Sequence, residues 1–350
     1  MSERKVRFLG GWVEPNRIGW VSYLNPTYAN RALTGVYMNR RRITDLFQID
    51  SSKTLLNEVL VILDLISSDV DSESVGNIFN VAEGLYNGNY PGYSACTTDY
   101  HDLNHAHNVF LAMARMIHGA VCEGQIFSQR QIVLGMMAAI LHDAGYIQKD
   151  SDREGTGAKY TAVHEKRSMD FLARHGEEFG LSADEIAAGC SIILCTDIDN
   201  DISKIAFPSA QIELLGRLLA SADLLAQLSD QNYLEKLLFL YYEYKEAGDG
   251  NFKSEFDMLK KAVAFYEFSE HRLQSLLHQA GRFMQSHFAA RCNISKNLYQ
   301  DAIKRHQHYL FKVLSTKDSD HRKYLRRSGI VQKVRCKYRT HEAKDRNKMV

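Results

Sequence analysis

Proline is scarce in this sequence, with only 4 in 350 residues. Because proline breaks helices, its scarcity leaves long stretches in which a helix can continue, and it favours an all-α fold. The sequence also lacks any run of about 18 apolar residues, which argues against a membrane-spanning helix. Its first residues lack the apolar stretch of a signal peptide. We therefore expect a cytoplasmic protein that makes no membrane contact.

Cysteine is also infrequent and shows no motif. The six cysteines form no CxxC pair and no dense spacing of the kind found in small disulfide-bonded domains. They are Cys96, Cys122, Cys190, Cys195, Cys292 and Cys336. We expect reduced thiols, in agreement with a cytoplasmic location.

Charge is balanced overall but unevenly distributed. Residues 304–350 contain 15 Lys and Arg against 4 Asp and Glu, and residues 1–44 contain 8 against 2, so the basic ends flank an acidic middle. The ends could bind nucleic acid or fold back onto the acidic body. Leu325, Ile330, Val331 and Val334 lie among the C-terminal charges. Because a free arm gains nothing from apolar residues, we expect this tail to dock on the body.

Apolar residues recur at spacings of three and four from about residue 52 to residue 312, which predicts successive helices. We expect helices over 75–86, 163–174, 183–194, 210–230 and 233–247, with two more between 256 and 312. The chain then divides into an irregular basic N-terminal arm (1–50), a helical N-terminal segment (51–95), a catalytic domain (96–247), C-terminal helices that complete the bundle (248–314) and a basic tail (315–350).

Four places in the helical region put His and Asp where a metal could bind. They are His101 with His105, His142 with Asp143, His164 with Glu165, and Asp223. Each alone is explained as a helix cap or a hydrogen-bonded core residue. Together they match a bundle in which ligands project inward from facing helices. An aspartate in an apolar segment costs several kcal/mol unless it is paired or coordinated. The mixed nitrogen and oxygen donors suit Zn, Mn, Fe, Co or Ni.

These segments resemble the HD-domain superfamily of metal-dependent phosphohydrolases. YHDLNHAHNV is similar to the YHNxxHAxxV segment of cyclic-nucleotide phosphodiesterases. AAILHDAGYI, HEKRSMDFL and SADLLAQL look like bacterial HD hydrolases in order and approximate spacing. The resemblance covers about residues 95–240. It implies an HD-domain helical bundle with extra N- and C-terminal segments.

The resemblance also implies a role for each matching residue. His105, His142, Asp143 and Asp223 match the ligands of a first metal, with Asp143 bridging to a second. His101 matches the histidine that protonates the leaving oxygen. His164 matches a ligand of a second metal such as Mg or Mn, and Glu165 could hold a water or orient a ligand. Two departures weaken the second site: Tyr146 stands where phosphodiesterases have a histidine, and only Thr196 and Asp197 replace another His pair.

Substrate-binding residues are less clearly marked. Lys159, Lys166 and Arg167 could hold a phosphate, or they could form a solvated helix face. Gln285 and Phe288 have the spacing of the glutamine and phenylalanine with which phosphodiesterases grip a base.

The sequence therefore predicts a hydrolase that cleaves a phosphodiester or nucleotide phosphoester with metal-activated water. Two alternatives remain open. Some HD proteins with two metals are di-iron oxygenases, and the chain could instead be a non-catalytic regulatory or nucleic-acid-binding HD protein that uses its basic ends.

Overall fold

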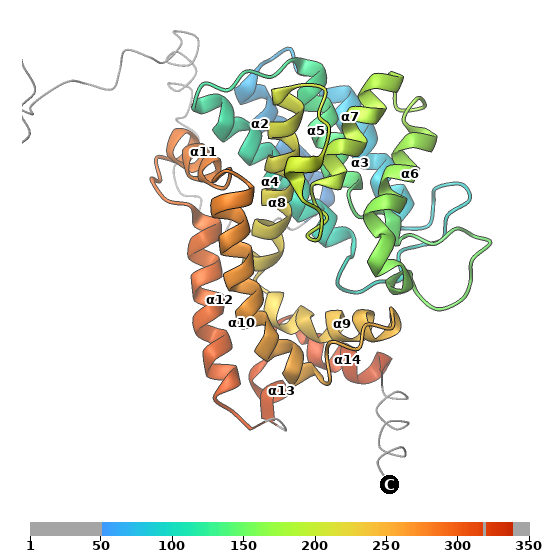
Figure 1. The fold of residues 1–350 in the computed structure, drawn as a ribbon, viewed down its shortest axis with the longest axis vertical. Coiled ribbons are helices and arrows are strands. Elements are labelled where there is room, and N and C mark those ends of the chain that lie inside the picture. The colour runs from blue at the N-terminus through green and yellow to red at the C-terminus, as the bar shows by residue number, and fades with distance from the viewer. Residues whose placement is uncertain (1–50, 318–319, 339–350) are drawn as a thin grey trace, which may run out of the picture.

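The prediction of an all-α fold is confirmed. The computed structural model describes residues 51–317 and 320–338, and these form thirteen α-helices with short 3₁₀ and π turns and no strand (Figure 1). The N-terminal arm (1–50) lies outside the described residues. None of the described helices combines the length and apolarity needed to cross a bilayer.

The helices begin and end close to the expected boundaries. Ser51 caps the first of them, and Ser182 with Glu185 forms the capping box that their spacing predicts. The helices are α2 (Ser52–Ile66), α3 (Ser72–Tyr86), α4 (Leu103–Cys122), α5 (Gln129–Leu141), α6 (His164–His175), α7 (Ala183–Leu194), α8 (Ala210–Ser229), α9 (Tyr233–Glu246), α10 (Glu255–His271), α11 (Arg282–Cys292), α12 (Leu298–Leu314), α13 (His321–Tyr324) and α14 (Ile330–Lys337).

Three helices, rather than the two expected, occupy residues 256–312. Helix α10 continues into a π turn, Arg272–Leu276, and the chain then reverses at His278 and Gln279, whose φ angles are 49° and 57°. Asn293 ends α11 with a φ of 54°. Histidine and asparagine adopt this left-handed conformation more often than most residues, but His278 and Gln279 include no Gly, Pro or Asn, so the sequence pattern did not indicate the first turn.

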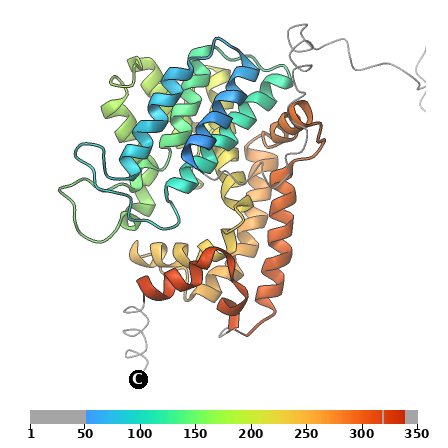
Figure 2. The same ribbon diagram turned by 180° about the vertical axis from the view of Figure 1, so that it is seen from behind.

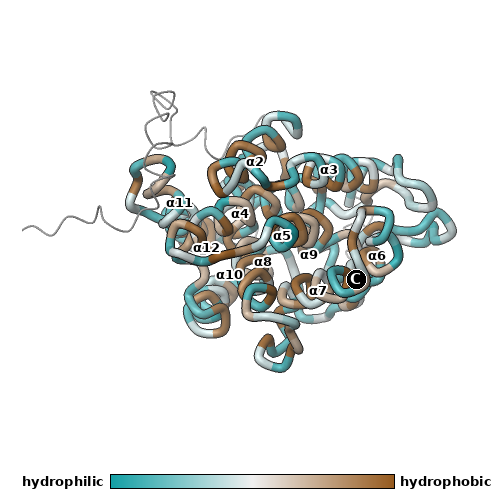
Figure 3. The backbone as a smooth tube through the Cα atoms, turned by 90° about the horizontal axis from the view of Figure 1, so that it is seen from above, coloured by the Kyte–Doolittle hydropathy of each residue, from teal (hydrophilic) through white to brown (hydrophobic). Residues whose placement is uncertain are grey.

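The helices enclose two apolar cores. In the larger core, α4 packs against α2, α5, α8 and α11. The smaller core joins α9, α10, the C-terminal part of α12 and α14, which lie below the main bundle in Figures 1 and 2. Seen from above, apolar residues gather where helices meet and polar residues gather in the outer loops (Figure 3). Phe265 on α10 and Ile303 on α12 pack against both cores.

The C-terminal tail docks on the body, as predicted, over the part that the structure describes. Leu325, Ile330 and Val334 are buried in the smaller core. Lys337 forms an ion pair with Asp99 at 2.7 Å, and the hydroxyl of Tyr338 donates to the same carboxylate at 2.9 Å. The segment therefore extends the smaller core.

Deleting residues 318–350 should lower the melting temperature by at least about 2 °C, because three buried apolar side chains lose their partners. Affinity for polyanions should barely change. Val334→Ser should reproduce part of the loss, whereas Cys336→Ser, on the exposed side of the same helix, should not. Differential scanning calorimetry measures both. An unchanged melting temperature in the truncated chain would refute the docking.

Two buried histidines join α4 to α11 far from the smaller core. Nδ1 of His118 lies 3.3 Å from Nδ1 of His287, and both side chains are almost inaccessible. Burial lowers the pKa of His118 to about 4, with a further contribution from Arg291, and holds the pKa of His287 well below its usual range. Both residues are therefore neutral in the folded protein at pH 7.

Acid should destabilise the fold through this pair. Below pH 6.5 the unfolded chain protonates both histidines while the folded chain does not, so stability falls as the pH drops from 6.5 toward 4. Each histidine should cost about 2 kcal/mol at pH 5. Urea unfolding at pH 7 and pH 5 measures the loss. It should shrink in a His118→Gln, His287→Gln double variant but not in His308→Gln, an exposed control; an equal loss in all three proteins would rule the pair out.

Candidate metal centre and cavity

The segment around His101 begins the site just before α4. Asp102 caps this helix by accepting a hydrogen bond from the backbone nitrogen of His105 at 2.9 Å. The helix starts at Leu103, so His101 precedes it and the two histidines do not share a helix face. Their rings are nevertheless 6.0 Å apart and perpendicular. His105 is thus fixed on the helix, while His101 is held by the preceding loop.

Four predicted ligands converge at one point. Nε2 of His105 lies 3.3 Å from Oδ2 of Asp143 and 3.2 Å from Oδ1 of Asp223. Nε2 of His142 lies 3.3 and 3.8 Å from the same two oxygens. Two donors that share one metal at about 2.1 Å lie roughly 3.0 to 3.4 Å apart, so the set fits a single ion. His105, His142 and Asp143 are buried, and Asp223 is partly exposed.

The polar atoms of this cluster lack ordinary partners. Nε2 of His142 and Oδ2 of Asp143 are buried without a hydrogen bond of acceptable geometry. Nδ1 of His142 lies 2.9 Å from the carbonyl of Ala139 and must donate to it, which leaves Nε2 as a lone pair in the neutral ring. A bound cation would satisfy both orphaned atoms.

The electrostatics of the cluster also favour a cation. Burial opposes a charge on His105, but the nearby carboxylates of Asp143 and Asp223 outweigh it and raise its pKa to about 10. Burial likewise opposes ionisation of Asp143, yet the neighbouring imidazoles of His142 and His105 hold its pKa well below the usual range. The carboxylates thus attract positive charge, which a proton or a metal can supply.

His164 approaches the opposite oxygen of Asp143. Its Nε2 lies 3.5 Å from Oδ1 of Asp143, while its Nδ1 donates to the carbonyl of Thr161 at 2.7 Å. Burial lowers the pKa of His164 to about 4, so the ring is neutral at pH 7. Gly145 allows this approach, since a Cβ there would lie 1.9 Å from the carbonyl oxygen of His164. Asp143 therefore faces imidazoles with both oxygens, as a bridging carboxylate would.

Glu165 lies next to this second position. Its Oε1 is 3.1 Å from Nε2 of His164. Burial, together with the charges of Asp197, Asp143 and Asp223, raises its pKa to about 8. Glu165 therefore carries a proton at neutral pH as long as no cation is bound beside it.

Glu243 on α9 is a functional candidate that the sequence pattern did not reveal. Its Oε2 accepts a hydrogen bond from Nδ1 of His101 at 2.8 Å, and its Oε1 accepts from the backbone nitrogens of Asp99 and Tyr100 at 2.8 and 2.7 Å. It is buried, although it follows two tyrosines in a helix that reads as amphipathic. An acidic residue on the apolar face was the one available signal.

Tyr146 completes the support of the histidines. Its ring stacks on His101 at 4.3 Å and on His164 at 4.4 Å, so one aromatic side chain spaces the two imidazoles. In the resembled phosphodiesterase motif this position holds a histidine. Here the phenol ring fills the position by packing.

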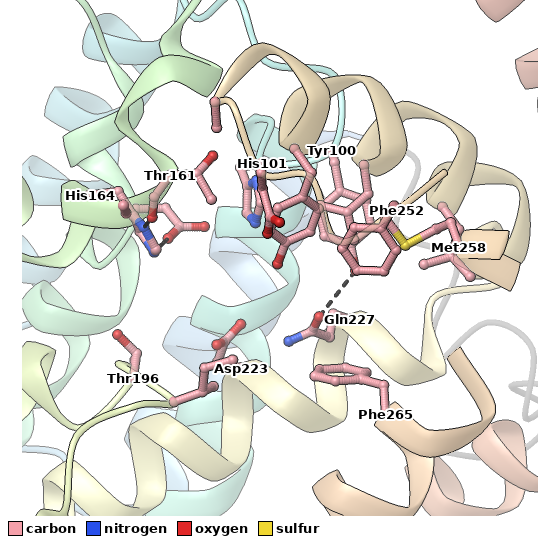
Figure 4. A pocket seen from close by; sticks show the side chains of 18 of the residues that line it. Tyr100, His101, Thr161, His164, Thr196, Asp223, Gln227, Phe252, Met258 and Phe265 are labelled. Atoms are coloured by element: carbon pink, nitrogen blue, oxygen red, sulfur yellow. Dashed lines mark hydrogen bonds and ion pairs between the residues drawn. The ribbon is translucent and has the colours of Figure 1, made fainter. Parts of the chain in front are cut away.

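A cavity of about 960 Å³ opens directly beside the cluster (Figure 4). His101, His105, Asp143, His164, Glu165 and Asp223 all line it. Thr196 and Asp197 also line it, on a loop that Arg272 holds with hydrogen bonds to the carbonyls of Cys195, Asp197 and Ile198 at 2.9 to 3.1 Å. The hydroxyl of Thr196 donates a hydrogen bond to the carbonyl of Ile193. The carboxylate of Asp197 is therefore the better candidate metal ligand of the two.

The three predicted phosphate-binding cations do not line this cavity. Lys159 pairs with Asp152 at 2.6 Å, and Lys166 is exposed on α6. Arg167 donates to the carbonyls of Gly145 and Ile147, at 2.6 and 2.9 Å, and lies over the ring of Tyr160. Arg167 therefore positions the turn that follows Asp143 and does not face the cavity.

Gln285 and Phe288 lie at the other end of the bundle. Both are on α11, which meets α4 at Gly119, about 21 Å along the helix from His105. Phe288 is buried beside Arg115, and Gln285 is exposed on the outer face. The turn at His278 and Gln279 directs α11 away from the cavity. Neither Gln285 nor Phe288 can therefore contact a ligand bound there.

The six cysteines are all free thiols and none belongs to the cluster, in agreement with the expectation of reduced cysteine. Among known protein families, a family model described as Npun_R2479-like matches residues 89–308, which include every residue of the cluster and of the cavity wall. A search of the curated proteins finds no match.

Proposed function

We propose that this chain, which belongs to the Npun_R2479-like family, is a metal-dependent phosphohydrolase acting at the cluster beside α4. The family description states no reaction, so the proposal rests on the site. One observation carries it: His105, His142, Asp143 and Asp223 come from three separate parts of the chain, and the ring nitrogens of the two histidines lie 3.2 to 3.8 Å from carboxylate oxygens of the two aspartates. Such convergence of buried charges is costly without a cation.

The donor set fits a divalent transition metal such as Zn, Mn, Fe, Co or Ni. His105, His142, Asp143 and Asp223 would hold the ion. When bound, it would supply an activated water and neutralise charge on the phosphoryl oxygens. Asp143 and His164, with Glu165 or Asp197, would hold a second ion such as Mg or Mn.

His101 has the position of a general acid. Its Nδ1 is engaged by Glu243, which fixes the ring and leaves Nε2 to pass a proton to a leaving oxygen in the cavity. Stacking on Tyr146 keeps the ring from turning toward the metal ligands.

Metal quantification followed by a panel of phosphoesters tests the proposal. Purified protein should contain about one or two transition-metal ions per chain, and added Mn, Mg, Co or Ni should support release of phosphate or of an alcohol from at least one substrate class. Metal-free protein with no hydrolysis across the panel would refute it. The arrangement of His164 opposite Asp143 also suits a di-iron oxygenase, and bound iron with a mixed-valence signal and no hydrolysis would favour that function instead.

A further inference from the structure

The cavity beside the metal cluster has two chemically different sides. Figure 4 shows His164, Thr196 and Asp223 on one side and Phe252, Met258 and Phe265 on the other. The first side comes from α6, α8 and the loop after α7, and the second from α10 and the loop before it. A ligand that reaches the cluster can therefore extend from a polar end to an apolar end.

The apolar side is large enough to hold the body of a small molecule. Six side chains that face the cavity from α9, α10 and the loop between them form it, and we call them the apolar slot. They are Leu237, Leu240, Phe252, Met258, Phe265 and Phe268. Phe268 is 39% exposed although it is a large aromatic residue, which places it at the mouth. Three phenylalanines around one space favour a flat ring system over a sugar.

The charges that line the cavity do not suit a polyphosphate. Among the described residues that line it, Lys261 is the one Lys or Arg. Its ammonium donates to the carbonyl of Asn251 and lies 3.5 Å from Asp257, so its charge is partly neutralised. Beyond the proposed metal ligands, which include Asp197, the carboxylates of Asp199 and Asp249 also line the cavity. Phosphates far from the metal would meet carboxylates without compensating cations.

Polar recognition between the two sides is sparse. The hydroxyl of Tyr100 donates to Oε1 of Gln227 at 3.0 Å, and this pair stands where the polar and apolar sides meet (Figure 4). The side-chain amide nitrogen of Gln227 can donate a hydrogen bond to one ester or hydroxyl oxygen near the phosphate. The walls beyond it offer mainly carbon.

We propose that the substrate is an ester with a single phosphate group and a bulky, apolar, aromatic body. This inference rests on the proposed function, with the phosphate at the metal cluster and the body in the apolar slot. Nucleoside polyphosphates are then not the expected substrates, because their additional phosphates and polar sugar fit neither side of the cavity.

Hydrolysis of four probes by the metal-loaded protein tests this preference. The probes are 1-naphthyl phosphate, AMP, glycerol 2-phosphate and ATP. We expect kcat/KM for 1-naphthyl phosphate to exceed that for AMP and glycerol 2-phosphate by on the order of tenfold or more, with ATP the poorest. AMP or ATP at or above the level of 1-naphthyl phosphate would overturn the proposal.

Slot variants test where the preference arises. Phe268→Ser changes a partly exposed residue and should not prevent folding; the ratio of kcat/KM for 1-naphthyl phosphate to that for glycerol 2-phosphate should fall about tenfold. Phe265→Ala should lower the same ratio from deeper in the slot. Phe311→Ser, 61% exposed on α12 and outside the cavity, is the matched control and should keep the ratio. An unchanged ratio in both slot variants would overturn the assignment.

Binding measurements separate this inference from the proposed function. Isothermal titration of 1-naphthyl phosphate into metal-loaded His101→Ala reports affinity without turnover. If no probe is hydrolysed but 1-naphthyl phosphate binds and Phe268→Ser weakens it about tenfold, the hydrolase proposal fails and the slot stands. If all monophosphate esters are hydrolysed at similar rates, the slot fails and the hydrolase proposal stands.

Discussion

Asp143→Ala should abolish metal binding. Asp143 is 2% exposed and contributes to the cluster with both oxygens, one 3.3 Å from His105 and His142 and the other 3.5 Å from His164. Removing it leaves two imidazoles and Asp223, with less negative charge to hold a cation. Loss of a residue that only hydrogen-bonds to a metal ligand already lowers metal affinity by about 10- to 100-fold. Because Asp143 is itself a proposed ligand, we expect its loss to lower the affinity by at least about 100-fold. Elemental analysis after dialysis measures it.

Two further variants make this result interpretable. Asp143→Asn keeps the shape and removes the charge, so it should retain the fold while losing most of the metal. Asp170→Ala, an exposed aspartate on α6, should keep both metal and activity. Circular dichroism establishes that each variant is folded. Full metal content and full activity in folded Asp143→Ala would contradict the site.

His101→Ala should keep its metal and lose about 10²- to 10⁴-fold in turnover, the usual contribution of a general acid. His101 is absent from the converging donors, and its Nδ1 is occupied by Glu243 at 2.8 Å. Pre-steady-state and steady-state hydrolysis, measured with metal content on the same sample, separate the two functions. Loss of metal in this variant would make His101 a ligand instead of the acid.

Glu243→Gln is the companion variant. The amide oxygen can still accept the backbone hydrogen bonds of Asp99 and Tyr100, but the negative charge beside His101 is gone. We expect metal content and fold to be retained and turnover to fall by less than in His101→Ala. Equal activity in Glu243→Gln and the unmodified protein would remove Glu243 from the mechanism.

The convergence of His105, His142, Asp143 and Asp223 could be predicted from sequence because these residues stand out locally. Asp143 and Asp223 are acids in apolar helical segments, and His105 and His142 lie at helix ends, where short patterns are informative. The cluster also belongs to the part of the fold that follows directly from helical periodicity. Its geometry needed only that α4, α5 and α8 pack together.

The cavity wall could not be predicted in the same way. Phe252 and Phe265 read as ordinary core residues, and they reach the site only because α9 holds the loop before α4 through Glu243 and α10 packs against α9. Gln285 and Phe288 had a suggestive spacing, yet the reversal at His278, which the pattern does not indicate, places them at the far end of the bundle. Glu243 was missed because its partners are 140 residues away in sequence.

The docking of the C-terminal tail could likewise be predicted only in part. The density of apolar residues in 325–334 predicted that the segment packs on the body, and Leu325, Ile330 and Val334 do so. Which surface receives it depends on the smaller core. Lys337 and Tyr338 meet Asp99 in the loop that carries His101, a contact no local pattern announces.

Hydrolysis in ¹⁸O-labelled water tests whether the protein uses a metal held at Asp143 to transfer water to a phosphate ester. Protein stripped with a chelator and then reloaded with metal is incubated with a monophosphate ester, and the released phosphate is analysed by mass spectrometry. We expect one ¹⁸O atom in each released phosphate. Labelled phosphate should form only after the metal is reloaded, and Asp143→Ala should release none. Phosphate without the label, or equal release by the stripped protein and the Asp143→Ala variant, would contradict it.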